Sequence, residues 1–320
     1  MISPASSDDV DKIVSNVQTA AVFANPRSGK GRSWKLLPRI EAAFQQHGFH
    51  TTVHETTNAE ELEELAKKTV REGVRHLFAF GGDGTLHSLV NAVFGYEVFF
   101  GIIPAGGGND FARALNLPLD PLRAISAALT GSSRCVDLVR VRTACGRTRF
   151  YLGGGGVGLD SESAKLANNR YKNRHGRLRY VSAAIHAYCN YKPQRIRVTL
   201  DDAPADTTWQ DFVLASFLNT PTFGAGIRLS PDAKIDDGLL DYAFLPELRL
   251  GQILRALPQL LFSGALNLPN IKRKQVRKVR IETEAPAYFQ GDGELMGLTP
   301  VEIEVAAGAV RFLAPKVSST

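Results

Sequence analysis

The stretch Gly81-Gly82-Asp83-Gly84-Thr85 decides the fold of this chain, because an apolar run precedes it and a helical pattern follows it. Residues 76–80 are typical of a buried strand, and residues 86–93 repeat apolar side chains at helical spacing. Glycines let the turn between them approach an anion closely, and a helix start favours negative charge. The stretch therefore predicts a phosphate-binding turn, in which a divalent cation, a water or a phosphoryl acceptor stands between Asp83 and the phosphate.

A tight turn without a ligand is the alternative, but two further glycine-rich loops weigh against it. The first, Asn25-Pro26-Arg27-Ser28-Gly29-Lys30-Gly31, follows the apolar residues 20–24. The other, Pro104-Ala105-Gly106-Gly107-Gly108-Asn109-Asp110, follows the apolar residues 98–103. Loops after successive parallel strands converge at the carboxyl edge of the sheet, where such folds bind ligands. Neither the Walker A pattern nor the dinucleotide fingerprint fits these loops.

Strand and helix patterns alternate up to about Gly131, which predicts βαβ units around a parallel sheet, with Asn58 at an N-cap position. After Gly131 the pattern changes to period two, as in residues 135–142 and 276–283, which is typical of antiparallel strands. An apolar helix is expected over residues 248–266. We therefore expect an α/β domain over residues 18–132 and a mainly antiparallel, sandwich-like domain over residues 133–305.

Composition limits the class of protein. The chain has 320 residues, 44% of them hydrophobic and 22% charged, as in ordinary globular proteins. It contains no apolar run long enough for a membrane span, and its acidic start does not resemble a secretory signal. Three widely spaced cysteines suggest neither a disulfide framework nor a zinc site, which favours a reducing cytoplasm.

Two basic clusters stand out against a net charge of +6. They are residues 170–179 and residues 272–280. Such runs attract polyanions, either a nucleic acid or the anionic face of a membrane, at about 1 kcal/mol per cation near a charged bilayer. A solvated strand or loop is the alternative interpretation for each cluster taken alone.

Two acidic segments in the second half are candidates for chemistry. Residues 230–241 place four carboxylates in a turn-rich segment that would suit a hard cation, although a polar hairpin turn is the simpler explanation. Gln290-Gly291-Asp292-Gly293-Glu294 places two acids around a glycine. A turn again explains the pattern; the functional alternative is a general base with a metal-linked neighbour.

In their order and spacing these motifs resemble the soluble lipid kinases with a diacylglycerol-kinase catalytic domain, a family that includes sphingosine and ceramide kinases. The matching motifs are Asn25-Pro26-x-Ser28-Gly29, Gly81-Gly82-Asp83-Gly84-Thr85, Pro104-x-Gly106-x-x-Asn109-Asp110-Phe111-Ala112-Arg113, Asp236-Asp237-Gly238-Leu239-Leu240 and Asp292-Gly293-Glu294. They extend over nearly the whole chain. The glycine turn alone is shared with NAD kinases and phosphofructokinases, so the series carries the resemblance.

The resemblance implies that ATP and Mg²⁺ bind between an α/β domain and a β-rich domain, and that residues 306–320 pack back on the first domain. It assigns the nucleotide contacts to Asn25, Pro26, Ser28, Gly29, Thr56, Gly81, Gly82, Asp83, Gly84, Thr85, Leu86, His87, Gly106, Gly107, Asn109 and Asp110. If the matching position is Val53 instead of Thr56, that nucleotide contact is lost. By the same resemblance, Asp83 lies among the metal-linked phosphates.

The resemblance also supplies a general base and a metal loop. Glu294 matches the acid that accepts the proton of the lipid hydroxyl. Lys234, Asp237 and Leu239 match positions that hold a structural Mg²⁺, the lysine and the leucine through their backbone oxygens. Phosphoryl transfer needs positioning and charge neutralisation more than covalent chemistry, so these residue types suit it.

Three positions depart from the family pattern. Gly107 stands where a threonine is frequent, Gly153 where an asparagine is common, and Ser88 where a glutamate is usual. These departures indicate an atypical branch and bear on nucleotide or lipid preference.

The leading hypothesis is an ATP- and Mg²⁺-dependent kinase that phosphorylates a lipid hydroxyl, on diacylglycerol or on a ceramide or sphingoid base. We expect it in the cytoplasm, at the inner face of the membrane, held peripherally by the two basic clusters. No specific nucleic acid is expected, and a homodimer is left open. The alternatives are an NAD kinase-like enzyme and a catalytically silent nucleotide-dependent binder of membranes or nucleic acid.

Overall fold

In the computed structural model, four parallel strands in the order β2-β1-β3-β4 form the sheet of the first half of the chain. The structure describes residues 18–316, apart from 27–32, 172, 175, 176, 193, 202–207, 248, 250, 253, 254, 256, 257 and 260–269. The strands are β1 (Gln18–Ala24), β2 (Phe49–Glu55), β3 (His76–Gly81) and β4 (Phe99–Pro104). Most of the apolar helix expected over residues 248–266 lies outside the described residues.

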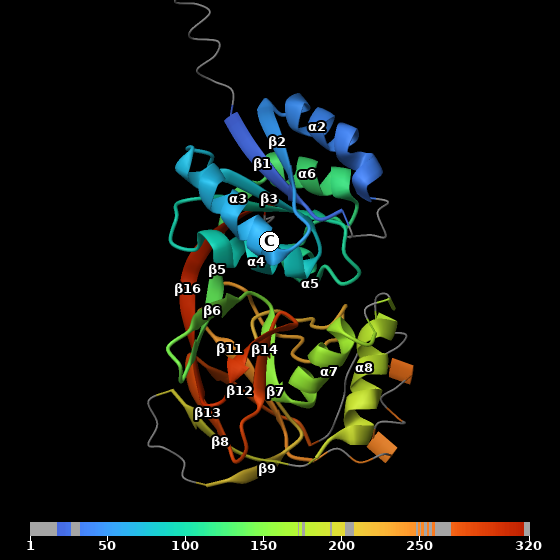
Figure 1. Cartoon of the computed structure of the whole chain (residues 1–320), viewed down its shortest axis with the longest axis vertical. Helices are drawn as coiled ribbons and strands as arrows, with labels where there is room; N and C mark the ends of the chain where they lie inside the picture. Colours follow the sequence, from blue (N-terminus) through green and yellow to red (C-terminus); the bar gives the residue numbers. More distant parts are fainter. Residues whose placement is uncertain are drawn as a thin grey trace, which may run out of the picture.

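Helices cover both faces of this sheet (Figure 1). They are the 3-10 turn η2 (Ser33–Leu36) and the helices α2 (Leu37–Gln46), α3 (Ala59–Arg71), α4 (Asp83–Val93), α5 (Asp110–Ala114) and α6 (Pro121–Leu129). Helix α2 packs on α6, and α3 packs on α4. As the sequence predicts, Asn58 caps α3: its side chain accepts from the Glu61 N–H at 2.8 Å.

The second half consists mainly of antiparallel strands, which confirms the predicted sandwich-like fold. One sheet has the order β12-β11-β10-β7-β14-β15, and its strands are β7 (Gly154–Gly158), β10 (Leu214–Leu218), β11 (Leu240–Leu245), β12 (Lys272–Val276), β14 (Tyr288–Gly291) and β15 (Glu294–Leu298). Two helices, α7 (Leu159–Asn168) and α8 (Arg177–Asn190), lie beside it (Figure 1). No helix within the described part of the chain is long and apolar enough to cross a membrane.

A long C-terminal strand, β16 (Val301–Ala314), joins the two halves. It pairs antiparallel with β5 (Ser132–Thr143) along most of its length and parallel with β4 at Arg311 and Phe312. The sheet of the first half therefore continues through β16 into β13 (Lys278–Thr283), β8 (Gln194–Leu200) and β9 (Gln210–Phe212), with β6 (Thr148–Tyr151) beside β5. The predicted domain boundaries, after residues 132 and 305, fall within β5 and β16 and stay a prediction.

Phe312 fixes β16 to the first half. Its side chain is fully buried, and its ring centre lies 5.4 Å from that of Phe100 and 5.0 Å from that of Phe111. Replacement of Phe312 by alanine leaves a cavity among these rings, so we expect the free energy of unfolding to fall by about 3–5 kcal/mol. Urea denaturation measures the loss. The exposed neighbour Arg311→Ala is the control, and an equal loss in both variants would contradict this role of Phe312.

Candidate active site

The glycine loops after β3 and β4 touch each other at the edge of the sheet. A Cβ atom placed on Gly106 would lie 2.5 Å from the Cα of Gly82, so only glycine allows this approach. The Ala105 N–H also donates to the Gly81 carbonyl at 2.8 Å. Gly82 is the N-cap of α4, which directs the positive end of that helix at the space between the loops. The two loops therefore form the kind of backbone surface that binds phosphate.

Asn109 shapes the second loop from within. It adopts a left-handed conformation (φ 55°), its Oδ1 accepts from the Gly106 N–H at 3.1 Å, and its Nδ2 donates to the Gly106 carbonyl at 3.0 Å. Both ends of the side-chain amide are thus used to hold the loop. The contribution of Asn109 that the structure displays is the shape of the loop.

Asp110 connects the second loop to the β-rich half. Its carboxylate accepts from the Thr222 hydroxyl at 2.9 Å, from the Ala225 N–H at 2.8 Å and from the Gly226 N–H at 2.7 Å. These donors lie in the loop after β10. Because its carboxylate accepts three hydrogen bonds from that loop, Asp110 is a clamp between the halves of the molecule.

Asp292 forms a second clamp, from the turn between β14 and β15. Its Oδ2 accepts from the Leu152 N–H at 2.8 Å and lies 3.2 Å from Nδ1 of His87 on α4, and its Oδ1 accepts from the Gly153 N–H at 2.8 Å. The His87 and Asp292 side chains are nearly inaccessible to solvent. The turn that carries Glu294 is therefore fixed against α4 of the first half.

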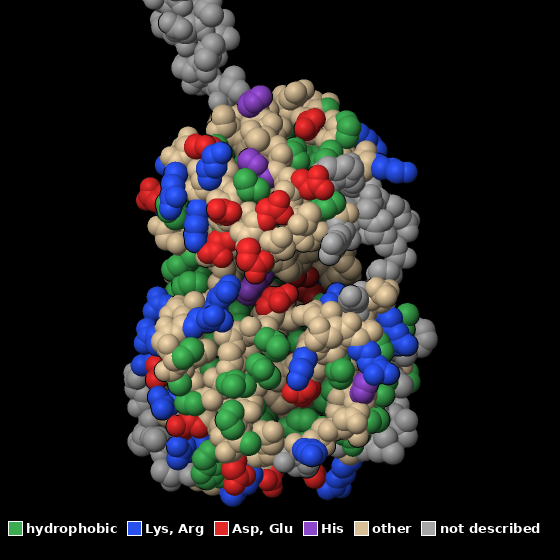
Figure 2. All heavy atoms as spheres, viewed as in Figure 1, with side chains coloured by type: hydrophobic (Ala, Val, Ile, Leu, Met, Phe, Trp, Pro, Cys, Tyr) green, Lys and Arg blue, Asp and Glu red, His purple; other side chains and the backbone are tan. Residues whose placement is uncertain are grey.

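Asp83 has fewer donors than these two acids. Its Oδ1 accepts from the Phe111 N–H at 3.2 Å. Burial raises its pKa to about 6, with further contributions from the negative charges of Asp110 and Asp292. In the space-filling view acidic side chains lie in the hollow between the two halves (Figure 2). The site therefore favours a cation or a bound proton next to Asp83.

Glu294, from the second half of the molecule, lies close to the glycine turn at residues 81–85 of the first half. A Cβ atom placed on Gly84 would lie 3.9 Å from Oε1 of Glu294, and the Glu294 side chain is exposed. Glu294 is thus close to Gly84, the neighbour of the other predicted catalytic residue, Asp83, although the two acids are far apart in the sequence.

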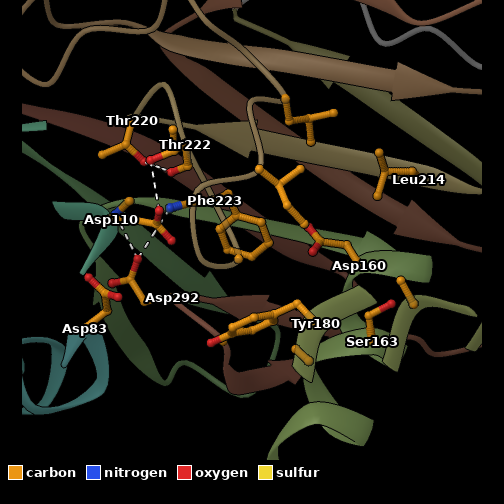
Figure 3. A pocket seen from close by; sticks show the side chains of 18 of the residues that line it. Asp83, Asp110, Asp160, Ser163, Tyr180, Leu214, Thr220, Thr222, Phe223 and Asp292 are labelled. Atoms are coloured by element: carbon orange, nitrogen blue, oxygen red, sulfur yellow. Dashed lines mark hydrogen bonds between the residues drawn. The ribbon is translucent and has the colours of Figure 1, made fainter. Parts of the chain in front are cut away.

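A cavity of about 210 Å³ opens from this cleft into the β-rich half. Asp83, Asp110 and Asp292 lie at one end, and the walls are mostly apolar (Figure 3). The apolar lining includes Leu152, Val181, Ala184, Ile185, Leu214, Phe223, Ile227, Leu229 and Leu245. Such a cavity suits a molecule with one polar end and a hydrocarbon body.

Tyr180 and Asp160 are polar lining residues that were not predicted as site residues. The Tyr180 hydroxyl points toward the acidic end (Figure 3), and burial raises its pKa to about 12, so it stays protonated and can donate a hydrogen bond. Asp160 on α7 accepts from the Ser216 hydroxyl at 2.8 Å, and burial raises its pKa to about 6. Both residues reach the cavity only because α7 and α8 pack against the sheet.

The other predicted nucleotide contacts lie near the same edge or outside the described residues. Asn25 and Pro26 follow β1, where the Asn25 N–H donates to the Phe80 carbonyl at 3.2 Å, whereas Ser28 and Gly29 lie outside the described part of the chain. Thr56 is buried, and its N–H donates to the Ala24 carbonyl at 2.9 Å. The remaining contacts Gly81, Thr85, Leu86 and Gly107 belong to the two touching loops and to α4.

The predicted metal loop is held by an acid that sequence reasoning did not single out. Asp137 on β5 is buried and accepts from the N–H groups of Gly238 and Gly308, each at 2.7 Å. Within the loop, Asp237 accepts from the Leu239 N–H at 3.0 Å, and Lys234 precedes it. The sequence feature that could have identified Asp137 is an acidic residue within an otherwise apolar strand.

Within the described part of the chain, no group of three or more His, Cys, Asp or Glu side chains is placed to hold a metal. The Mg²⁺ site at Lys234, Asp237 and Leu239 therefore stays a prediction. The Asp83 carboxylate would supply a hard oxygen ligand of the kind that Mg²⁺ prefers, and a cation there would offset the charge that burial and the neighbouring acids disfavour.

Gly153 allows the second clamp to form. A Cβ atom placed there would lie 3.2 Å from Oδ1 of Asp292 and 3.3 Å from Oγ1 of Thr220. A larger side chain at this position, such as the asparagine common in the family pattern, would require its neighbours to shift.

Family models match both halves of the chain. The model described as diacylglycerol kinase catalytic domain matches residues 19–141. The model described as YegS C-terminal NAD kinase beta sandwich-like domain matches residues 155–314, half of the chain. The chain therefore belongs to this family of lipid kinases and is itself a lipid kinase.

Individual relatives match over nearly the whole length. A probable lipid kinase YegS-like protein of Stenotrophomonas maltophilia is 30% identical over 90% of this chain and 94% of its own. A diacylglycerol kinase of Mycobacterium tuberculosis is 28% identical over 92% of this chain and 94% of its own. A crystal structure from Bacillus anthracis, of a protein assigned as a diacylglycerol kinase, has a TM-score of 0.75 at 22% identity and covers 93% of this chain and 97% of that chain. That structure supports the fold.

The raised pKa of Asp83 predicts a pH-dependent stability. Its value in the folded chain, about 6, lies above the ordinary 3.8, so ionisation of Asp83 opposes folding. This cost is absent at low pH, grows as pH rises toward 6 and is complete above that. Asp83→Asn should therefore raise the free energy of unfolding at pH 7.5 by on the order of 1–3 kcal/mol, with a smaller gain toward pH 4.5.

Denaturant titrations at several pH values measure this gain. Asp110→Asn is the matched variant, and we expect it to destabilise the chain because it removes a carboxylate that accepts from the Ala225 and Gly226 N–H groups. Equal effects of the two substitutions on the free energy of unfolding would contradict the distinction between Asp110, which holds the two halves together, and Asp83, whose ionisation opposes folding.

Proposed function

We propose that this lipid kinase transfers the γ-phosphoryl group of ATP to a hydroxyl of diacylglycerol, with a ceramide or sphingoid base as the alternative acceptor. The observation that carries the proposal is the cavity, which is apolar along its walls and ends at carboxylates beside the glycine loops. The names of the relatives add support for diacylglycerol.

The loops and helix α4 supply the phosphate side of the reaction. Backbone N–H groups of Gly82, Asp83 and Gly84 and the positive end of α4 would hold the phosphates of ATP. Mg²⁺ at Asp83 would neutralise phosphate charge when it is bound. The clamps at Asp110 and Asp292 keep the two halves in register, so that the hydroxyl and the phosphate meet at a fixed distance.

Glu294 supplies the proton acceptor. The lipid hydroxyl gives its proton to the Glu294 carboxylate, its oxygen forms a bond to the γ-phosphorus, and the bond from that phosphorus to ADP breaks. The exposed Glu294 side chain beside Gly84 is compatible with this role, since it faces the phosphate turn. The Tyr180 hydroxyl can donate a hydrogen bond to a polar group of the lipid at the acidic end.

The apolar walls argue against the alternative of a kinase for NAD. A polar dinucleotide would leave the side chains of Ile185, Leu214 and Phe223 in contact with its charged groups. The acids Asp83 and Glu294, both retained in the cleft, argue against a silent nucleotide binder.

A panel assay tests the proposed reaction. Purified protein is incubated with labelled ATP, Mg²⁺ and mixed micelles of diacylglycerol, ceramide, sphingosine or undecaprenol, and NAD is a separate acceptor. We expect a labelled phospholipid from diacylglycerol or a sphingolipid, and Glu294→Gln should lower kcat at least about a hundredfold. Glu304→Gln, on the exposed part of β16, is the control. Labelled NADP without labelled lipid would overturn the proposal.

We also propose that the two basic clusters hold the enzyme on the cytoplasmic face of an anionic membrane. The cluster 170–179 precedes the part of α8 that lines the cavity, and Arg170 and Arg174 are exposed. The cluster 272–280 is divided between β12 and β13, and Arg273 donates to the carbonyl of Leu229, a cavity residue, at 3.3 Å. Arg273 therefore lies beside the cavity wall, and Arg179 of the other cluster directly precedes the lining residue Tyr180. A homodimer stays a prediction.

Sedimentation with vesicles tests the membrane proposal. Reversal of Arg170 and Arg174 to glutamate should weaken binding to vesicles rich in phosphatidylglycerol by more than tenfold, since each cation contributes about 1 kcal/mol near a charged bilayer. Binding should also fall with added salt. Reversal of Arg71 and Arg75, in the first half, is the control. Equal binding to neutral and anionic vesicles would contradict the proposal.

A further inference from the structure

The peptide groups around Gly293 are held by two side-chain amides. The Gly293 N–H donates to Oε1 of Gln290 at 2.9 Å, and the Gly293 carbonyl accepts from Nδ2 of Asn168 at 2.7 Å. Gly293 has φ of 87°, a conformation that favours glycine, and it immediately precedes Glu294. A glycine carries no side chain that could pack, so these bonds define the orientation of the peptide that leads into Glu294.

Asn168 is itself held in place. It is the last residue of α7, and its Oδ1 accepts from Nη2 of Arg179 on α8 at 2.6 Å. Nε of Arg179 donates to the Ala167 carbonyl at 3.0 Å, and the guanidinium carbon lies 5.6 Å from the centre of the Tyr180 ring. The amide of Asn168 thus accepts from one helix and donates to the turn, which fixes its orientation.

The same two helices form a wall of the cavity. Ser163 and Ala164 of α7 and Tyr180, Val181 and Ile185 of α8 line it. The contacts of α7 also extend to β14 and β15, the strands that flank the turn. A molecule bound in the cavity would therefore contact the helices that hold the turn.

We propose that Asn168, oriented by Arg179, is a positioning residue that aims the Glu294 carboxylate at the lipid hydroxyl and connects the cavity wall to the proton acceptor. This inference rests on the proposed role of Glu294. Asn168 does not touch the reacting atoms; it acts through the Gly293 carbonyl. Loss of its bond lets the Gly293–Glu294 peptide rotate, and a displacement of about 1 Å at a reacting group can cost about a hundredfold in rate.

Three substitutions test the two hydrogen bonds of Asn168, the one that it accepts from Arg179 and the one that it donates to the Gly293 carbonyl. Asn168→Ala removes both bonds. Asn168→Asp keeps an acceptor for Arg179 but cannot donate to the Gly293 carbonyl. Arg179→Lys keeps the charge but cannot make both bonds of the guanidinium group. The control is Asn190→Ala at the end of α8, where the side-chain amide donates to the His186 carbonyl of its own helix.

Steady-state kinetics with diacylglycerol micelles give the first readout. We expect Asn168→Ala and Asn168→Asp to lower kcat about ten- to a hundredfold with little change in the KM for ATP, and Arg179→Lys to have a smaller effect in the same direction. Asn190→Ala should match the wild type. In the Glu294→Gln background, Asn168→Ala should cause no further loss, because the group that it positions is absent.

Hydrogen exchange gives a readout that does not depend on activity. We expect Asn168→Ala and Asn168→Asp to speed exchange in the peptide covering residues 288–298, with melting temperatures close to that of Asn190→Ala. An unchanged exchange rate in that peptide, or a loss of kcat that multiplies in full with that of Glu294→Gln, would overturn the inference and leave the proposed function intact. A wild-type kcat in Glu294→Gln would instead remove Glu294 from the mechanism.

Discussion

Two buried carboxylates hold the halves of this molecule together, and the active site depends on them. Asp110 extends from the first half to N–H groups at positions 225 and 226, whereas Asp292 extends from the second half to His87 on α4. A buried carboxylate that lost such donors would carry an uncompensated charge, at a cost of several kcal/mol. The bonds therefore fix the spacing of the cleft, and with it the distance between the glycine loops and Glu294.

The fold of the first half could be predicted because its signals are local. Each glycine loop follows directly after an apolar strand, and the Asn58 cap and the turn at residues 81–85 involve neighbours in the sequence. Parallel strands then bring the loops to one edge without further information. The contact between Gly82 and Gly106 agrees with this expectation, because it needs only adjacent strands and two residues without side chains.

The remainder of the site could not be derived from pattern alone. Asp292 lies 205 residues from His87, and nothing local distinguishes it from an acid in an ordinary turn. Tyr180 and Asp160 belong to helices whose patterns do not specify which wall they form. The pairing of β16 with both β4 and β5 depends on long-range register. For Glu294 the resemblance to a family supplied a role that the turn by itself left open.

The three acids at the end of the cavity differ in how their charge is compensated, and this difference supports the proposed Mg²⁺ contact at Asp83 over one at Asp110 or Asp292. Asp110 and Asp292 already accept from several donors, so each gains little from a cation. Asp83 has fewer donors; burial raises its pKa, and the negative charges of Asp110 and Asp292 raise it further. The clamps that hold the halves together thus also add to the electrostatic demand that burial creates at Asp83. A phosphate that arrives with its own divalent cation satisfies that demand, whereas a bare phosphate increases it.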